Sequence, residues 1–407
     1  MSREYDLILV MTTFRRATVY LPIIKELSSR FRIGLYIFDI PEKVKIKTLQ
    51  TDKIFLDLCC QLGAEIVRDT PVKARLSIIP QWPYTPEQIS TMKDSIQCGH
   101  KFALMGLMWG NLHLDKMRQL AIDKYLIIDK DIYKFRLEKR KHEREYNINL
   151  QNLVETGLPF LRYPVFEDFG IDYLIAHPSP LSLPEAKDKY NYLKCLLKLL
   201  ASIDRTEKII LKPHNGDERY DYLLNKRMVN CLMKRGVFLF DGVIFWCAKT
   251  LLCLLNSMRW LALCKMKNIL YDVLIVLYYK KLLKKVVLLK SITPYHNFSL
   301  EIFLPHAKKG LITGRSNSIW HALLLKKAVY NCVDKNTIKE NKEKMNYYSM
   351  QYFEVPYCRG KLIFDEKYFG IIRDEVRTRD MIRFLDEVLS FKKVLKAQTK
   401  EMHFMEP

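Results

Sequence analysis

Residues 1–130 alternate short apolar runs of strand length with segments whose apolar residues recur at helical spacing. Strands that alternate with helices in this way form βαβ units with a parallel sheet. The pattern therefore predicts a doubly wound α/β domain, which we place at residues 1–165. Its expected strands lie at 5–12, 33–39, 74–82, 101–110 and 124–129, and its expected helices at 15–31 and within 52–67.

The alternation restarts after residues 155–170, a stretch with proline and glycine that is typical of a connection between domains. We therefore expect a second doubly wound domain at 166–376. A strongly amphipathic pattern at 377–398 predicts a further helix within a C-terminal segment, 377–407. In the second domain we expect a strand that begins at 171 and further strands at 208–211, 285–290 and 310–314. Helical patterns lie at 189–204, 218–236, 299–309 and 317–334.

One segment of the second domain does not fit the alternation. Residues 237–284 are the most apolar part of the chain, yet charges such as Asp241 and Lys249 interrupt every window long enough to span a membrane. Two interpretations stay open for this apolar helical insertion. It is either a helical hairpin lying in a membrane interface, with Trp246 and Trp260 at headgroup depth, or a pair of buried core helices.

The composition favours an anionic partner and a reducing compartment. The 407 residues carry a formal net charge of +22, which suits nucleic acid, an acidic membrane face or a phosphorylated substrate. The 10 cysteines include no C-x-x-C pair and are expected to be buried, reduced thiols. The N-terminal apolar run is too short for a secretory signal. We expect a cytoplasmic protein, peripheral on the inner face of the cell membrane.

The clearest candidate chemistry follows the strand at 208–211. Lys212, Pro213, His214 and Asn215 come together at its end. In an open parallel sheet, ligands bind outside the carboxyl ends of the strands. We therefore expect Lys212, His214 and Asn215 to bind substrate. Lys212 would supply charge, and His214 would donate a hydrogen bond to a phosphate oxygen.

A second candidate element follows the strand at 310–314. Gly314 allows a tight turn, and a helix is expected to begin near Ser318. The hydroxyl groups of Ser316 and Ser318, the free N–H groups of the first turn, and Arg315 make a candidate anion site. The alternative for Ser318 is an ordinary N-cap, which many helices have.

Taken together and in this order, "KIILKPHN" and "GLITGRSNSIWHALLLKKAVYN" resemble paired motifs of GT-B-fold enzymes that build bacterial surface polymers. These enzymes include capsule transferases, polysialyltransferases and CDP-glycerol glycerophosphotransferases. The resemblance covers residues 171–334 best. It implies two Rossmann-like domains facing a cleft, with the nucleotide-linked donor held by the second domain.

The resemblance also implies roles for individual residues. His214 would bind the donor phosphates, and Ser316 and Ser318, beside the Gly314 turn, would bind phosphate or ribose. This chain departs from the family pattern in two places. Proline precedes His214, where the family has His-Pro, and Asn317 separates the two serines.

The first domain is expected to supply the groups that activate the acceptor. A transferase needs a base to deprotonate the acceptor hydroxyl. The candidates at strand ends are Asp39, His113 and Asp129, of which we favour His113 as the catalytic residue. Arg15 and Arg16 follow the first strand and are expected to bind a phosphorylated acceptor.

Three further histidines are weaker candidates for the site. His177 follows the first strand of the second domain, where a donor loop would pass, so it is a second-rank donor contact. The alternative is a histidine with an ordinary structural role. His306 and His321 lie in segments with helical patterns, and we expect them to be structural.

The resemblance implies transfer of a sugar or polyol phosphate from a nucleotide-activated donor to a lipid-linked or polymeric glycan acceptor. Such a glycosyltransferase would serve capsule or other polysaccharide biosynthesis at an anionic membrane surface. No convincing Asp-x-Asp pair is present, so neither a metal nor another cofactor is expected. The alternatives are a nucleotide-sugar epimerase of the same fold and a basic nucleic-acid-binding protein. Because the charge is spread along the chain and no nucleic-acid motif occurs, we expect no nucleic-acid partner.

Overall fold

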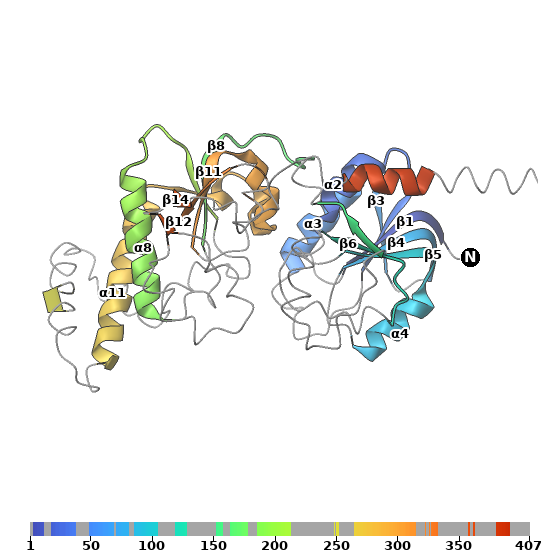
Figure 1. Cartoon of the computed structure of the whole chain (residues 1–407), viewed down its shortest axis with the longest axis horizontal. Helices are drawn as coiled ribbons and strands as arrows, with labels where there is room; N and C mark the ends of the chain where they lie inside the picture. Colours follow the sequence, from blue (N-terminus) through green and yellow to red (C-terminus); the bar gives the residue numbers. More distant parts are fainter. Residues whose placement is uncertain are drawn as a thin grey trace, which may run out of the picture. The chain divides into compact units, whose positions relative to one another are not determined.

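The chain is described here from a computed structural model, which divides it into two compact units (Figure 1). The first unit comprises Met1–Glu167 and Phe369–Pro407, and the second comprises Asp168–Tyr368. The structure describes residues 3–11, 18–37, 49–68, 71–80, 85–104, 119–127, 152–157, 163–177, 185–212, 264–314, 327–332 and 380–390, with isolated positions at 248, 250, 251, 322, 325, 357, 358, 361 and 362.

The first unit is built on a parallel sheet of seven strands with the order β3-β2-β1-β4-β5-β6-β7. Its strands are β1 (Arg3–Met11), β2 (Ile33–Ile37), β3 (Ala64–Val67), β4 (Val72–Pro80), β5 (Ile96–Leu104), β6 (Lys124–Ile127) and β7 (Leu153–Glu155). Its labelled helices are α2 (Tyr20–Leu27), α3 (Leu49–Gln61) and α4 (Pro86–Ser95). The predicted doubly wound parallel architecture is confirmed for this unit.

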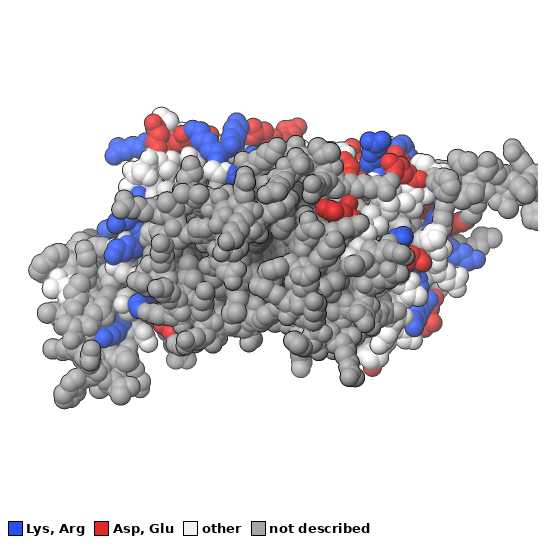
Figure 2. Space-filling model, viewed as in Figure 1, with Lys and Arg blue, Asp and Glu red and all other residues white. Residues whose placement is uncertain are grey.

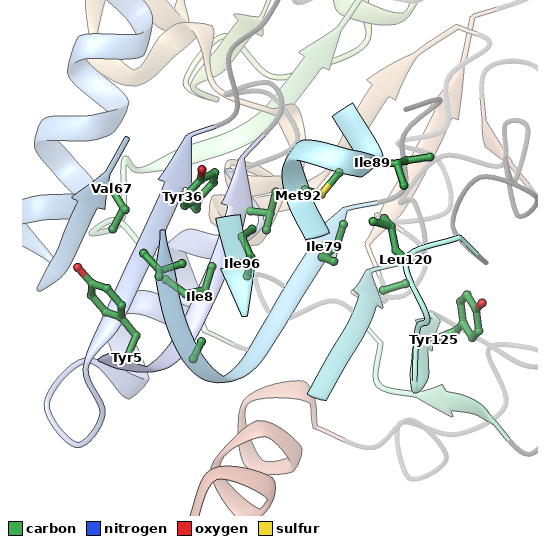
Figure 3. Close-up of a cluster of buried hydrophobic side chains, with 14 of the residues drawn as sticks. Tyr5, Ile8, Tyr36, Val67, Ile79, Ile89, Met92, Ile96, Leu120 and Tyr125 are labelled. Carbon is green, nitrogen blue, oxygen red and sulfur yellow. The ribbon is translucent and has the colours of Figure 1, made fainter. Parts of the chain in front are cut away.

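Local sequence explains these elements. Residues 7–10 of the central strand β1 are all fully buried, because both faces of a doubly wound sheet are covered. Helix α4 begins at a capping box, in which Thr85 and Gln88 satisfy each other's backbone N–H groups. Side chains from the sheet and from α4 form one core cluster, including Ile8, Ile79 and Met92 (Figure 3).

The C-terminal helix at 381–390 packs against this first unit. Its Phe384 stacks on Phe102 of β5, with ring centroids 5.9 Å apart. Arg75 of β4 donates a hydrogen bond to the carbonyl of Leu389. Asp386 pairs with Arg30 at 2.8 Å. The amphipathic helix expected at 377–398 is therefore present over 381–390, and its apolar face completes the core of the first unit.

The second unit has a parallel sheet of five strands with the order β10-β9-β8-β11-β12. The strands are β8 (Ile171–Ala176), β9 (Ile209–Lys212), β10 (Val287–Leu288), β11 (Ala307–Thr313) and β12 (Ala328–Asn331). Helices α8 (Ala186–Ala201) and α11 (Cys264–Leu283) pack against each other, and a small antiparallel pair joins β13 (Tyr357–Cys358) to β14 (Lys361–Leu362). This unit also has the predicted doubly wound parallel sheet.

Helix α11 is the described part of the apolar insertion expected at 237–284. Leu274, Ile275 and Leu282 are fully buried in a cluster with α8 and the sheet. For this helix, the structure favours the core interpretation over a hairpin lying wholly in a membrane interface. Among the described residues, no helix combines the length and apolar character that crossing a bilayer needs. Most of residues 237–263 lies outside the described part of the chain.

Three sequence expectations about local structure are wrong in detail. The segment 299–309, for which a helix is predicted, instead forms the short 3₁₀ turns η9 (Leu300–Ile302) and η10 (Leu304–His306), followed by β11. Pro305 explains this, since a proline has no N–H for a helical hydrogen bond. The end of the helical pattern at 317–334 is the strand β12. The strand expected at 101–110 begins earlier, at Ile96.

Two further features bear on packing. Gly310 of β11 cannot be replaced freely, because a Cβ atom there would lie 2.4 Å from the carbonyl oxygen of Ala328 on β12. Among the described cysteines, Cys59 and Cys332 are buried, but Cys60 is exposed. The expectation of buried thiols is therefore wrong for Cys60, since neighbouring helical residues point about 100° apart and only one can face the core.

Candidate functional site

The strand order of the second unit reverses between β8 and β11. The chain runs outward from β8 to β9 and β10, and then crosses back to β11 and β12 on the other side. In doubly wound sheets, ligands bind outside the carboxyl ends of the strands at this point of reversal, because the following loops separate in opposite directions. The carboxyl edge around β8 and β11 is therefore the candidate ligand site of this unit.

The strand register brings three predicted site residues to this edge. Ala176, the last residue of β8, lies opposite Lys212 on one side and Thr313 on the other. The backbone N–H of His177 donates to the carbonyl of Lys212 at 3.4 Å, and the Thr313 hydroxyl donates to the carbonyl of Ala176 at 2.7 Å. Lys212, His177 and Gly314 are thus held side by side by the central strands.

Lys212 lies on the face of the sheet opposite α8 and α11. Ile209 and Leu211 belong to the core cluster with these two helices, and side chains of a strand alternate between faces. The Lys212 side chain is only 2% exposed. Lysine is rarely buried so deeply, and here it lies at the end of a strand on the candidate ligand edge.

His177 points to the other face and is enclosed by aromatic side chains. Its Nδ1 atom lies 3.1 Å from the hydroxyl of Tyr192 on α8. Its ring lies 5.7 Å from the Tyr192 ring and 5.9 Å from the Tyr279 ring of α11. This environment resembles that of a histidine in the core, and a contact between His177 and a donor stays a prediction.

All of the other predicted site residues lie outside the described part of the chain: Arg15, Arg16, His113, His214, Asn215, Arg315, Ser316 and Ser318. The structure does describe the strands that lead to them. His214 and Asn215 directly follow Lys212 and Pro213 at the end of β9, and Arg315 directly follows Gly314 at the end of β11. Their roles stay predictions.

The first unit has a corresponding point of reversal, between β1 and β4. The chain runs from β1 to β2 and β3 on one side, and from β4 to β7 on the other. Arg15 and Arg16 follow β1 along the sequence, at this reversal, whereas His113 follows β5. By the same rule, the segment that contains the two arginines leaves the sheet where a ligand is expected to bind.

Sequence reasoning missed one histidine near the carboxyl edge of the second unit. His296 lies in the 3₁₀ turn η8 (Pro294–Asn297) and is half-buried. Burial is the main reason why its pKa lies below the ordinary value, and the positive charges of Lys212 and Lys290 lower it further. No local motif marks His296, because Lys212 comes from a distant part of the sequence.

The opposite, amino edge of this sheet has a different character. Lys308 pairs with Asp168 at 3.2 Å, and Lys309 pairs with Glu207. His306 is buried there against the ring of Phe169, at 5.1 Å between centroids, and burial lowers its pKa. The prediction that His306 is structural agrees with this position. On the face drawn in Figure 2, the described Lys and Arg residues are likewise interspersed with Asp and Glu.

Within the described residues, no group of three or more His, Cys, Asp or Glu side chains is placed to hold a metal ion. The fold is that of a protein with two Rossmann-like α/β units, and the candidate site is the carboxyl edge of the second sheet. No family model matches the chain, and no curated protein matches its sequence.

Comparison of structures finds proteins of similar general architecture. The UDP-GlcNAc 2-epimerase of Methanocaldococcus jannaschii, in complex with UDP-GlcNAc and UDP, matches 90% of this chain and 98% of its own, with 11% identity and a TM-score of 0.42. The UDP-N-acetylglucosamine 2-epimerase of Rickettsia bellii matches 100% and 98%, with 10% identity and a TM-score of 0.36. The calicheamicin glycosyltransferase CalG4 matches 96% and 98%, with 10% identity and a TM-score of 0.39.

Proposed function

We propose that the protein is an enzyme that binds a nucleotide-activated sugar or polyol phosphate at the carboxyl edge of the second sheet. It transfers the activated group to a glycan acceptor in bacterial surface polysaccharide synthesis. The observation that carries this proposal is the buried Lys212 at the end of β9, beside the reversal between β8 and β11. A buried cation at this edge suits the phosphate groups of a nucleotide.

The proposed chemistry is a displacement in which the nucleotide is the leaving group. The bond between the donor's anomeric carbon and its phosphate oxygen breaks, and the acceptor oxygen forms a new bond to that carbon. For a polyol-phosphate donor, the same exchange takes place at phosphorus. His113 would accept the acceptor's proton, while Lys212, His214 and Arg315 would stabilise the charge on the departing nucleotide.

Two experiments distinguish this transferase from a nucleotide-sugar epimerase and from a nucleic-acid-binding protein. Calorimetry with CMP, CDP, UDP and a DNA duplex measures which class of anion binds. Proton NMR of UDP-GlcNAc and of CDP- and CMP-linked donors, with and without a glycan acceptor, then follows the chemistry. A transferase releases nucleotide in step with product, whereas an epimerase inverts the sugar without an acceptor. Tight binding of DNA alone would rule out both enzymes.

Ser318→Ala separates a phosphate contact from a helix cap. If Ser318 binds phosphate, nucleotide affinity should fall about tenfold to a hundredfold, since a charge-assisted hydrogen bond is worth roughly 1.5–3 kcal/mol. If it only caps a helix, the change should cost about 1 kcal/mol of stability and leave affinity unchanged. Nucleotide titrations and thermal melts on the same preparation measure the two effects.

We also propose that the end of α11 attaches the protein to an anionic membrane. Lys281, Lys284 and Lys285 are exposed there, next to the exposed apolar side chains of Leu283 and Val287. Basic side chains beside exposed apolar ones are typical of surfaces that bind anionic lipid headgroups. The occupant of this surface would be the inner face of the cell membrane, where lipid-linked acceptors are found.

Replacing Lys281, Lys284 and Lys285 with glutamate should weaken binding to phosphatidylserine vesicles more than a hundredfold. Each lost positive charge costs about 1 kcal/mol of binding free energy, and each added negative charge costs more. A matched control changes three exposed lysines of the first unit, Lys53, Lys73 and Lys93, to glutamate with the same change in net charge. Vesicle sedimentation measures both. If both triple variants lose vesicle binding equally, binding depends only on net charge and the proposed surface at the end of α11 is wrong.

A further inference from the structure

The segment between β10 and β11 covers the face of the second sheet on which Lys212 lies. A crossover between parallel strands is right-handed in nearly all proteins. Helices α8 and α11 belong to crossovers that lead from β8 outward to β10, whereas the segment after β10 leads back past β8 to β11. The return crossover therefore lies on the opposite face from the two helices. It consists of η7 (Leu289–Ser291), η8, η9 and η10.

Strand pairing brings the start of this segment beside Lys212. Leu288 of β10 pairs with Leu211 of β9, so Lys212 is level with Leu289, and Lys290 follows directly. The turn η7 contacts β9, and η8 contacts η7. The η8 turn contains His296, and the positive charges of Lys212 and Lys290 both lower the pKa of its imidazole. Three basic side chains from β9, η7 and η8 thus gather at the carboxyl end of β9.

The three side chains differ in exposure in a way that suits a ligand entering from solvent. Lys212 is buried, His296 is half-buried, and Lys290 is exposed. The Nδ1 atom of His296 is enclosed and has no hydrogen bond of normal geometry among the described residues, although backbone groups of Thr293 and Pro294 favour the protonated ring. Basic side chains at the carboxyl end of a strand, one of them open to solvent, are suited to bind a phosphate group.

We propose that Lys212, Lys290 and His296 form a phosphate subsite. Lys212 is its most buried member, His296 is half-buried, and Lys290 lies at the surface. The ligand class is a phosphate or diphosphate group, and on the proposed function above, on which this inference rests, it is the diphosphate or monophosphate of the donor nucleotide. Lys290 and His296 then add contacts from a segment for which the sequence alone indicated no role.

The test titrates inorganic pyrophosphate, CDP and UDP, and the nucleosides cytidine and uridine, into the full-length protein by calorimetry. Lys290→Ala and His296→Asn should each weaken pyrophosphate and nucleotide binding about fivefold to tenfold, because each removes one charged or polar donor to phosphate. The control is Lys198→Ala, which removes the same charge from an exposed position on α8, on the other face of the sheet, and should leave affinity unchanged.

The outcomes separate this inference from the proposed function. If nucleotide binds and turns over but neither variant changes its affinity, the subsite is disproved and the transferase proposal stands. If pyrophosphate binding depends on Lys290 and His296 while no nucleotide-linked donor is turned over, the subsite stands and the proposed function fails. A wild-type protein that binds no pyrophosphate overturns the subsite. Should His296→Asn fail to fold, the exposed Lys290 still provides the test.

Discussion

Replacing His214 with alanine should reduce transfer from the nucleotide-linked donor at least about a hundredfold, while leaving the melting temperature unchanged. His214 is two positions beyond Lys212, at the end of β9. The loss of one well-placed hydrogen-bond donor to a developing negative charge costs roughly a hundredfold or more in turnover. Stability should not change, because the proposed role of His214 is to contact the ligand.

Steady-state kinetics with the donor found by NMR provide the measurement, and thermal melts check the fold. His100→Ala is the control, since His100 is a partly exposed histidine of β5 that lies 3.4 Å from Asp123 in the first unit. It should retain normal turnover. Near-normal turnover in the His214 variant would mean that the donor site was assigned to the wrong loop.

Phe384→Ala should lower the free energy of unfolding of the first unit by about 3 kcal/mol, the usual cost of removing a buried phenyl ring. Phe384 stacks on Phe102 and is 7% exposed. The helix at 381–390 also buries Leu385 and Leu389, and the carbonyl of Leu389 accepts a hydrogen bond from Arg75. The loss of the aromatic contact removes one part of this buried face and should also loosen the helix.

Hydrogen exchange followed by mass spectrometry can locate this effect. Peptides from β4 and β5 should exchange faster in Phe384→Ala, whereas peptides from β8 and β9 in the second unit should not. Arg383→Ala is the matched control, because the Arg383 side chain is 79% exposed and lies on the solvent side of the same helix. Unchanged exchange in β4 and β5 would contradict the view that this helix completes the first core.

The alternation of strands and helices was readable from the sequence because each signal is local. A strand that is covered on both faces is apolar at nearly every position, as at residues 7–10 of β1 and 209–211 of β9. Helix signals such as the apolar spacing of α2 and the amphipathic pattern at 381–390 are equally local. Lys212 and Gly314 could be proposed as site residues because they directly follow such strands.

Segments in which tertiary context outweighs local pattern were predicted less well. Residues 299–309 have apolar positions at helical spacing, but those side chains pack against the sheet from 3₁₀ turns, with Phe303 and Leu304 fully buried. The apolar character of α11 was compatible with a membrane interface or a core. Its contacts with α8 favour the core, since no pattern within one helix identifies the surface that covers it.

By itself, the sequence determined the fold class and the strand ends at which ligands are expected, because these follow from the local order of apolar and polar residues. Only the tertiary structure decided which strands are neighbours, and so where each sheet reverses. It also decided that His296 and Lys290 lie beside Lys212, and that His177 faces the aromatic core of α8 and α11. The physical reason is that strand neighbours and charge clusters depend on crossovers between distant segments, which leave no periodic signal along the chain.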